Sequence, residues 1–263
     1  MFTKPIGHLY ADLQKTPYWK NYYKWFGDPF LHYHLCYAYL KRELLNLSQK
    51  TKVIDWGCGD GTYINHLAHD FNVEGIGIDN RPDRLQKAQE IAAIHNINTN
   101  FINLDITSPN LFVGEFEVAT CFDVIEHIKP ADVEAVFKNI ATSLTEGGLF
   151  ILRVPHEKDQ KYLNKSSQQF FYGDDHHEKP GYTHEELNIL LSKYNFKVEK
   201  IIYNYYWLAQ IVYEISERIR SKSKFAYSIF SAIFRYLDYI EINSHLLSFS
   251  RANGILIVAR KSI

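Results

Sequence analysis

The stretch DWGCGDG, Asp55 to Gly61, places three glycines and two aspartates directly behind the apolar pair Val53-Ile54. Glycines in such a loop let the backbone approach a bound molecule closely. Their spacing is G-x-G-x-G rather than the G-x-G-x-x-G of dinucleotide-binding loops, and the loop carries no basic residue. The acidic companions therefore favour a ligand with hydroxyl and ammonium groups over one with a pyrophosphate.

Two further carboxylates follow apolar runs and could complete such a site. Asp79 ends the run GIGID, where it can accept hydrogen bonds from two ribose hydroxyls. Each such charge-assisted bond contributes about 1.5 to 3 kcal/mol when it is well formed. Asp105 ends the run at 101–106 and could accept a hydrogen bond from an adenine amino group. Together these residue types predict a ligand that contains a nucleoside.

The segment CFDVIEHI supplies candidates for acid–base chemistry. If the chain forms a helical turn there, spacings of three and four residues place Asp123, Glu126 and His127 on one face. His127 is the natural general base and Glu126 its neighbour, because an imidazole titrates near neutral pH. The alternative is structural: Glu126 caps the turn and His127 packs against the next helix.

Short apolar runs alternate with helical periodicity and must position these residues. Such alternation predicts a mostly parallel α/β sheet covered by helices on both faces, and the glycine stretch would lie at the carboxyl end of its first strand, where open sheets of this kind bind ligands. A helix is expected to open at Pro130 and to stop at Gly147-Gly148, and Thr183 with Glu186 has the spacing of a capping box. The strands are expected near 53–55, 75–79, 101–106, 116–124, 149–154, 197–207 and 253–261.

Composition narrows the class of protein. The chain has 263 residues, of which 46% are hydrophobic, enough for the core of one globular domain. A formal net charge of −1 gives no reason to expect a nucleic-acid partner. Its three cysteines lack Cys-x-x-Cys spacing, which indicates reduced thiols. The first residues lack the apolar core of a signal peptide and no run is long enough to span a bilayer, so we expect a cytoplasmic protein.

Several motifs together resemble a known family. VIDWGCGDG, GIGIDN, NLDI and FEVATCFDVIEHI occur in the order found in class I S-adenosylmethionine-dependent methyltransferases, and GGLFILRVP and NGILIVARK are also similar. The resemblance covers residues 50–207 and 253–261 and is strongest to the small-molecule and quinone O-methyltransferases. It implies a Rossmann-like, seven-stranded, mostly parallel sheet with an antiparallel last strand.

The resemblance also implies roles for individual residues toward S-adenosylmethionine, which would leave as S-adenosylhomocysteine. The residue at the end of the first strand would orient the methionine ammonium, the glycines would leave room for the cofactor, and the later motifs would hold the ribose, the adenine and the adenosine. The cofactor residues implied are Asp55, Gly57, Gly59, Gly61, Asp79, Asn80, Asp105, Ile106, Phe122 and Asp123.

Some relatives hold a divalent ion with an E-x-x-E-H segment, which makes a metal a second hypothesis. Here Asp123 stands at the first position, one methylene shorter than Glu. With Glu126, His127 and either His176 or His177 it could still form an oxygen and nitrogen ligand set. A solvated loop explains the polar cluster around these histidines more simply. We therefore expect no metal and no effect of a chelator on activity.

Segments outside the shared core should recognise the methyl acceptor. They are an N-terminal helical cap at 1–50, the loop from Pro155 to Thr183, and a helical insertion at 208–249 that interrupts the core before its last strand at 250–263. Aromatic density in the cap suits either packing on the core or a lid over an apolar acceptor. The expected substrate residues are Tyr22, Tyr23, His156, His177 and Tyr182.

The insertion at 208–249 combines an apolar stripe with a basic cluster. This pattern is typical of a helix that rests on a membrane surface, or of an ordinary lid packed on the N-terminal helices. Arg235 and Asp238 interrupt the second apolar run, so it cannot span a bilayer. The acceptor is expected to be a small metabolite or a lipid- or glycan-linked one, with no nucleic acid as partner.

The sequence as a whole predicts an S-adenosylmethionine-dependent enzyme that methylates an oxygen atom. Two alternatives are a metal-assisted methyltransferase acting on a catechol or an RNA end, and a cofactor-binding partner subunit without catalysis. The complete set of acidic and glycine motifs argues against the second alternative.

Overall fold

The computed structural model describes residues 5–27, 31–45, 51–71, 73–109, 112–157, 177–206 and 252–262, together with 211, 214–215, 218–219, 222–223, 226–227 and 229–230. The chain forms two compact units. One comprises Met1–Glu43, Lys158–His176 and Tyr203–Gly254, and the other comprises Leu44–Glu157, His177–Ile202 and Ile255–Ile263.

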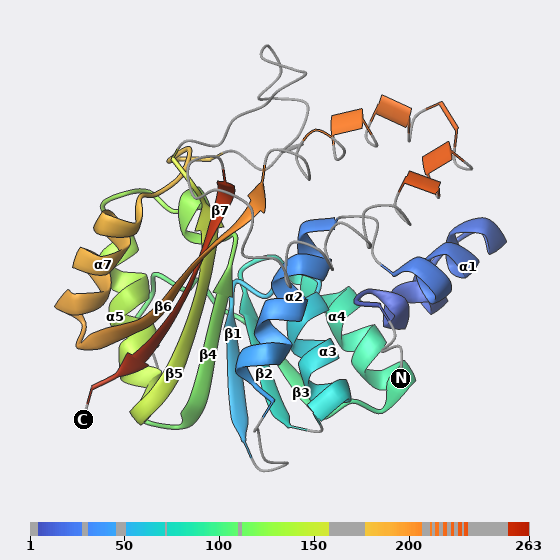
Figure 1. The fold of residues 1–263 in the computed structure, drawn as a ribbon. Helices are drawn as coiled ribbons and strands as arrows, with labels where there is room; N and C mark the ends of the chain where they lie inside the picture. The colour runs from blue at the N-terminus through green and yellow to red at the C-terminus, as the bar shows by residue number, and fades with distance from the viewer. Residues whose placement is uncertain are drawn as a thin grey trace. The chain divides into compact units, whose positions relative to one another are not determined.

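A seven-stranded sheet organises the second unit (Figure 1). Its spatial order is β3-β2-β1-β4-β5-β7-β6. The pairs β1/β2, β1/β4, β2/β3 and β4/β5 are parallel, and β7 runs antiparallel to its neighbours. This confirms the predicted fold class. The strands are β1 (Lys52–Trp56), β2 (Glu74–Asp79), β3 (Thr99–Asn103), β4 (Phe116–Phe122), β5 (Leu144–Pro155), β6 (Phe196–Tyr206) and β7 (Ala252–Lys261).

Helices cover both faces of this sheet. α3 (Thr62–Phe71) and α4 (Pro82–His95) lie on one face, and α5 (Val133–Ser143) and α7 (His184–Lys193) lie on the other (Figure 1). The strands are buried because both of their faces are covered, which explains their continuous apolar runs. The predicted capping box opens α7: Glu186 N donates to Thr183 Oγ1 at 3.1 Å, and Thr183 N donates to the Glu186 carboxylate at 3.0 Å.

The prediction for the helix between β4 and β5 was wrong at both ends. α5 begins at Val133, three residues after Pro130, and ends at Ser143 rather than at Gly147-Gly148. β5 starts at Leu144, which pairs with Phe116 before the register shifts. Leu144, which the helical pattern assigned to the helix, therefore pairs with β4 instead. The register of this pairing shifts by a β-bulge or a similar irregularity between Phe116 and Val118.

The first unit contains η1 (His8–Leu13), α1 (Pro17–Phe26) and α2 (Leu31–Glu43). Tyr22 on α1 is buried and stacks on Tyr227 of the insertion, with ring centroids 5.8 Å apart. Trp19 contacts the same ring edge-on at 6.3 Å. At Tyr227, therefore, the insertion packs on an N-terminal helix, as the lid alternative expected. Arg235, Asp238 and most of the apolar stripe fall outside the described residues.

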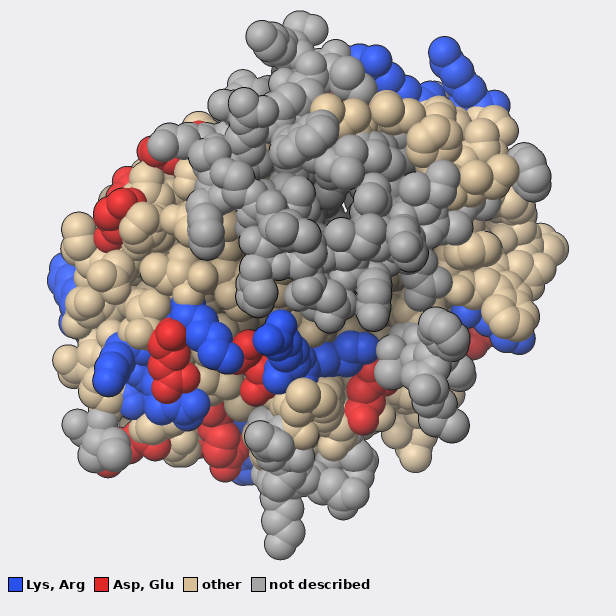
Figure 2. All heavy atoms as spheres, viewed as in Figure 1, with Lys and Arg blue, Asp and Glu red and all other residues tan. Residues whose placement is uncertain are grey.

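Three observations bear on the expectations from composition. Cys36, Cys58 and Cys121 are buried and form no disulfide bond. Within the part of the chain that the structure describes, no helix is both long and apolar enough to cross a membrane. On the face drawn in Figure 2, the visible basic and acidic side chains are interspersed.

Candidate functional site

The glycine loop lies where the strand order reverses. β1 has β2 on one side and β4 on the other, and the chain leaves the carboxyl end of β1 through Gly57 to Gly61 into α3. Crevices at such a switch point are where open α/β sheets bind ligands. The predicted cofactor residues at the ends of β1, β2 and β4 therefore come together at one edge of the sheet.

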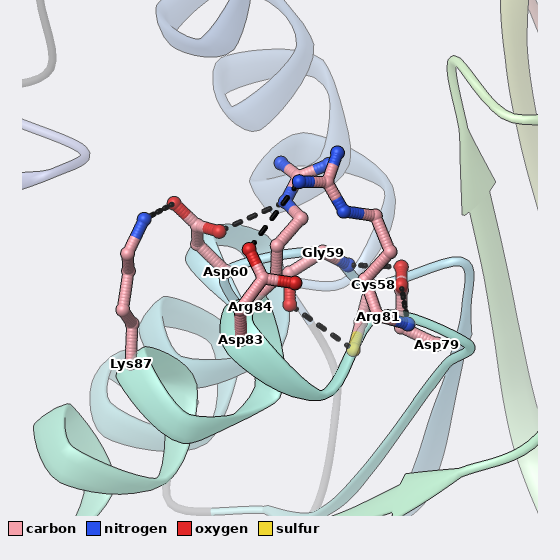
Figure 3. Close-up of polar contacts among 8 residues, drawn as sticks. All are labelled: Cys58, Gly59, Asp60, Asp79, Arg81, Asp83, Arg84 and Lys87. Atoms are coloured by element: carbon pink, nitrogen blue, oxygen red, sulfur yellow. Dashed lines mark hydrogen bonds and ion pairs between the residues drawn. The ribbon is translucent and has the colours of Figure 1, made fainter. Parts of the chain in front are cut away.

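Acceptor groups of the protein itself already bind the amides of this loop. Gly57 N and Cys58 N both donate to the Ile78 carbonyl, at 2.8 and 2.9 Å. Gly59 N donates to Asp79 Oδ2 at 2.8 Å (Figure 3). A phosphate-binding loop presents such amides to its anion. Here these three are engaged, which fits the expectation that a pyrophosphate is not the ligand.

Gly61 is required by packing as well as by backbone conformation. Its φ is +71°, and a Cβ built there would lie 2.7 Å from Ala88 Cβ and 2.9 Å from the Phe101 ring. Real Cβ atoms do not come that close, so any side chain would push α4 and β3 away from the loop. This glycine serves the close approach of helix and sheet.

Asp79 is the central acceptor of the hydrogen bonds at the end of β2. Its Oδ2 accepts from Gly59 and its Oδ1 accepts from Arg81 N at 2.9 Å. Each carboxylate oxygen has two acceptor positions, so one position on each remains after these bonds. The side chain is thereby fixed with acceptors left for a ligand, as a diol requires. Asn80 follows it and is exposed.

The basic side chains near Asp79 are paired with carboxylates. Figure 3 shows Arg84 Nε bound to Asp60 at 2.9 Å, and Lys87 near the same carboxylate at 3.8 Å. Arg81 reaches Asp83 at 3.3 Å. These ion pairs balance the local positive charge, which weakens the case for a bound phosphate.

Asp55 at the end of β1 is the most deeply buried carboxylate of the loop. Its Oδ1 accepts the Thr120 hydroxyl from β4 at 2.7 Å, while its buried Oδ2 has no hydrogen-bond partner. Burial raises the pKa of Asp55 to about 7, the Thr120 bond opposes this, and the charge of Asp79 adds to it. A ligand ammonium would supply the missing donor and the missing charge. The residue therefore suits the role that the family resemblance implied.

The residues expected around the adenine are arranged less uniformly. Phe122 is buried at the end of β4 and its ring lies 4.6 Å from that of Tyr63. Ile106 is buried, but Asp105 is exposed and accepts both the backbone N–H and the hydroxyl of Thr107. Asp105 thus closes its own turn, and its contact with adenine stays a prediction.

Asp123 does not join Glu126 and His127 on one face. It has a φ of 55° and forms an ion pair with Arg153 of β5. The Arg153 carbonyl also accepts Asp123 N at 2.9 Å. This pairing directs the carboxylate toward the neighbouring strand, so the expectation that Asp123 shares one helical face with Glu126 and His127 was wrong.

Glu126 and His127 instead meet His177. The predicted turn exists as η2 (Ile125–His127), and one ligand atom from each of Glu126, His127 and His177 lies within 4.8 Å of the others. The two imidazole rings contact edge-on with centroids 4.6 Å apart. Glu126 is buried, its Oε2 has no hydrogen-bond partner, and burial raises its pKa to about 8.

Hydrogen bonds bring His177 to this turn from fifty residues away in sequence. Lys179 N donates to the Glu126 carbonyl at 3.1 Å, and the Tyr182 hydroxyl donates to the Ile125 carbonyl at 3.1 Å. Tyr182 also bridges His156 at the end of β5. Three expected substrate residues, His156, His177 and Tyr182, therefore belong to one small assembly around η2.

The remaining expected residues lie elsewhere or outside the described part. Tyr22 and Tyr23 belong to the first unit, where Tyr22 packs in an aromatic cluster, so their contact with an acceptor stays a prediction. His176 falls outside the described residues.

Sequence reasoning missed two partners of the site. Thr120 and Arg153 are polar residues inside the apolar strands FEVATCF and LFILRVP. A polar side chain at a buried strand position needs a partner, and that signal could have identified both.

The chain is similar in sequence to known proteins. A family model described as a methyltransferase domain matches residues 30–201. A carboxy-S-adenosyl-L-methionine synthase from Nautilia profundicola is 30% identical over 142 residues, which cover 54% of this chain and 59% of that protein. The same enzyme from Nitratiruptor is 22% identical over 202 residues, covering 74% and 76%.

Solved structures show the same fold. Phosphoethanolamine N-methyltransferase 2 of Haemonchus contortus, in complex with S-adenosyl-L-methionine, superposes with a TM-score of 0.63 at 18% identity, covering 99% of this chain and 61% of that one. A SAM dependent methyltransferase from Archaeoglobus fulgidus gives 0.57 at 18% identity, covering 94% and 100%.

Proposed function

The chain belongs to the methyltransferase-domain family, and we propose that it transfers the methyl group of S-adenosylmethionine to an oxygen atom of a small metabolite. One observation carries the proposal most: a buried carboxylate oxygen of Asp55 without a partner and the fixed carboxylate of Asp79 flank one glycine loop. S-adenosylmethionine offers an ammonium to the first and ribose hydroxyls to the second. The loop amides already donate to groups of the protein and are not available to a phosphate, and S-adenosylmethionine has no phosphate.

The reaction would be an in-line displacement. The acceptor oxygen attacks the methyl carbon, the bond from that carbon to sulfur breaks, and the sulfonium becomes the neutral thioether of S-adenosylhomocysteine. The acceptor's proton passes to a base, for which His127 beside Glu126 is the candidate. Alignment of the two reactants and exclusion of water supply most of the acceleration, about 7 kcal/mol or more.

The acceptor would contact the assembly around η2. His156, His177 and Tyr182 lie there with the Glu126–His127 turn, and they can donate or accept hydrogen bonds to an acceptor hydroxyl. We propose that the acceptor is a small metabolite or a lipid- or glycan-linked one. We further propose a cytoplasmic enzyme without a nucleic-acid partner, in which residues 208–249 can touch a membrane surface.

A screen with labelled methyl donor tests this proposal. The full chain is incubated with methyl-labelled S-adenosylmethionine and a panel of hydroxylated metabolites, and label in each product is located by mass spectrometry. We expect label on an oxygen atom, with S-adenosylhomocysteine formed in equal amount. Label on nitrogen or carbon would contradict O-methylation while leaving the donor assignment intact.

The curated relatives favour a second candidate. Both of those described above are carboxy-S-adenosyl-L-methionine synthases, so this chain could make the carboxylated nucleoside instead of methylating an acceptor. Native mass spectrometry of the protein purified from cells separates the two, because the retained ligand has a different mass in each case. Retained carboxy-S-adenosylmethionine favours the second candidate, and retained S-adenosylhomocysteine, the product of methyl transfer, favours the first.

A further inference from the structure

We infer that Glu126, His127 and His177 form a binding site for one divalent transition-metal ion of the zinc type. The site is built from two segments that the fold brings together, η2 after β4 and the chain that precedes α7. It stands independently of the methyl-transfer proposal, because it concerns binding of an ion by the protein alone.

The first support is the ligand set itself. One carboxylate oxygen and two imidazole nitrogens lie within 4.8 Å of one another. Bonds of about 2.0 to 2.2 Å place tetrahedral ligands about 3.4 Å apart, so closure on an ion needs side-chain movements of about 1 Å. His177 is half-buried and can make such a movement.

The second support is the state of Glu126. Its side chain is buried, and Oε2 has no hydrogen-bond partner. A buried carboxylate oxygen without a donor is costly unless a ligand satisfies it. An ion held by the two histidines would lie within reach of this carboxylate and would supply the missing charge.

The third support is that the backbone around the ligands is fixed. Lys179 N and the Tyr182 hydroxyl both donate to carbonyls of η2, at 3.1 Å each. The capping box of Thr183 then fixes the start of α7 immediately afterwards. These bonds hold the segment that carries His177 against the turn that carries the other two ligands.

The donor chemistry selects the kind of ion. Two imidazoles with one carboxylate suit zinc, iron, cobalt or nickel, whereas magnesium and calcium prefer an all-oxygen set. Three protein ligands leave at least one coordination position open for an exogenous oxygen. This set also differs from the one considered from the sequence, because Asp123 is paired with Arg153 and takes no part in it.

A bound ion would change the role of His127. As a ligand it could not accept the acceptor's proton, and the ion's charge would instead make a coordinated hydroxyl easier to deprotonate. Without an ion, the imidazole itself remains the base. The two roles make different predictions for His177, which is a metal ligand in the first case and only a contact of the acceptor in the second.

Cobalt provides the test. The metal-free full chain is titrated with Co²⁺ and followed by visible absorption, without methyl donor or acceptor, and then with Zn²⁺ in competition. The variants are His177→Ala and the isosteric Glu126→Gln, and the control is His184→Ala, which removes a nearby histidine that pairs with Glu185. Far-ultraviolet circular dichroism verifies that each variant is folded.

We expect one equivalent of Co²⁺ to bind with a d–d spectrum and to be displaced by Zn²⁺. Either ligand substitution should weaken binding by about a hundredfold or more, and the control should leave it unchanged. Absence of stoichiometric binding in the wild type, or equal loss in the control, would overturn the site. Methyl transfer that persists in chelator would leave the proposed function standing, so failures of the two proposals are distinguishable.

Discussion

Among single residues, Asp79 connects the loop to the proposed donor. Asp79→Asn keeps the size of the side chain but removes its charge and one acceptor, and we expect it to weaken S-adenosylmethionine binding by about ten- to a hundredfold. Isothermal titration calorimetry measures the change. Asp83→Asn is the control, because that carboxylate is exposed and pairs only locally with Arg81. Equal affinities for wild type and Asp79→Asn would refute the ribose assignment.

The raised pKa of Asp55 predicts that the stability of the protein depends on pH. Its folded pKa of about 7 lies above the ordinary value of 3.8, so the native state binds more protons than the unfolded state between these values. The contribution of Asp55 to the free energy of unfolding is therefore fully present below about pH 4 and is lost as pH rises to about 7.

The variant Asp55→Asn isolates this effect. Relative to wild type, its free energy of unfolding should rise between pH 4 and pH 8 without donor, on the order of 4 kcal/mol for the full pKa difference. Urea unfolding at several pH values measures it. Parallel curves for the two proteins would show that Asp55 is not the titrating group. Added S-adenosylmethionine should stabilise the wild type most above pH 7, where the carboxylate is charged.

The proposed role of His127 as base predicts that its removal affects turnover but not folding. We expect His127→Ala to lower turnover by about a hundredfold or more while donor affinity and melting temperature change little. The matched variant is His177→Ala: if His127 acts as base, it should raise KM for the acceptor with little change in kcat, and if both histidines hold an ion, it should lower kcat as much as His127→Ala does. Loss of stability with unchanged turnover per folded molecule would instead assign His127 to packing.

At the level of elements, alanine substitutions at two glycines distinguish the cost of backbone strain from the cost of overpacking. Gly61 and Gly114 both have positive φ, but a Cβ on Gly61 would meet Ala88 and Phe101, whereas nothing lies within 4 Å of one on Gly114. Gly114→Ala should cost about 1 to 2 kcal/mol from backbone conformation alone. Gly61→Ala should cost a further 1 to 3 kcal/mol, roughly, from overpacking. Chemical unfolding of both variants tests this, and equal losses would contradict the packing role.

Local patterns predicted most elements because their causes are local. The capping box of Thr183 and Glu186 and the glycine turn after β1 are set by neighbouring residues, and both appear as expected. The end of α5 was mispredicted because Leu144 pairs with Phe116 on another strand, a contact that no window of sequence around α5 contains. The direction of Asp123 depends on Arg153 in the same way.

For the molecule as a whole, the sequence predicted the positions of Asp55 and Asp79 better than the position of His177. Asp55 and Asp79 lie on strand ends whose order follows from the alternation of strands and helices. His177 could not be placed beside Glu126, because its position depends on the hydrogen bonds of Lys179 and Tyr182 to η2. The residue types of the segment before α7 do not reveal these hydrogen bonds, which join it to a distant part of the chain.

Calorimetric titration of the full chain with S-adenosylmethionine, S-adenosylhomocysteine and NAD tests the central claim most directly. The carboxylates of Asp55 and Asp79 and the engaged loop amides predict saturable, one-to-one binding of the first two and none of NAD. Binding should also raise the melting temperature with ligand concentration, as expected when only the native state binds. Tight binding of NAD with no response to S-adenosylmethionine would contradict the account.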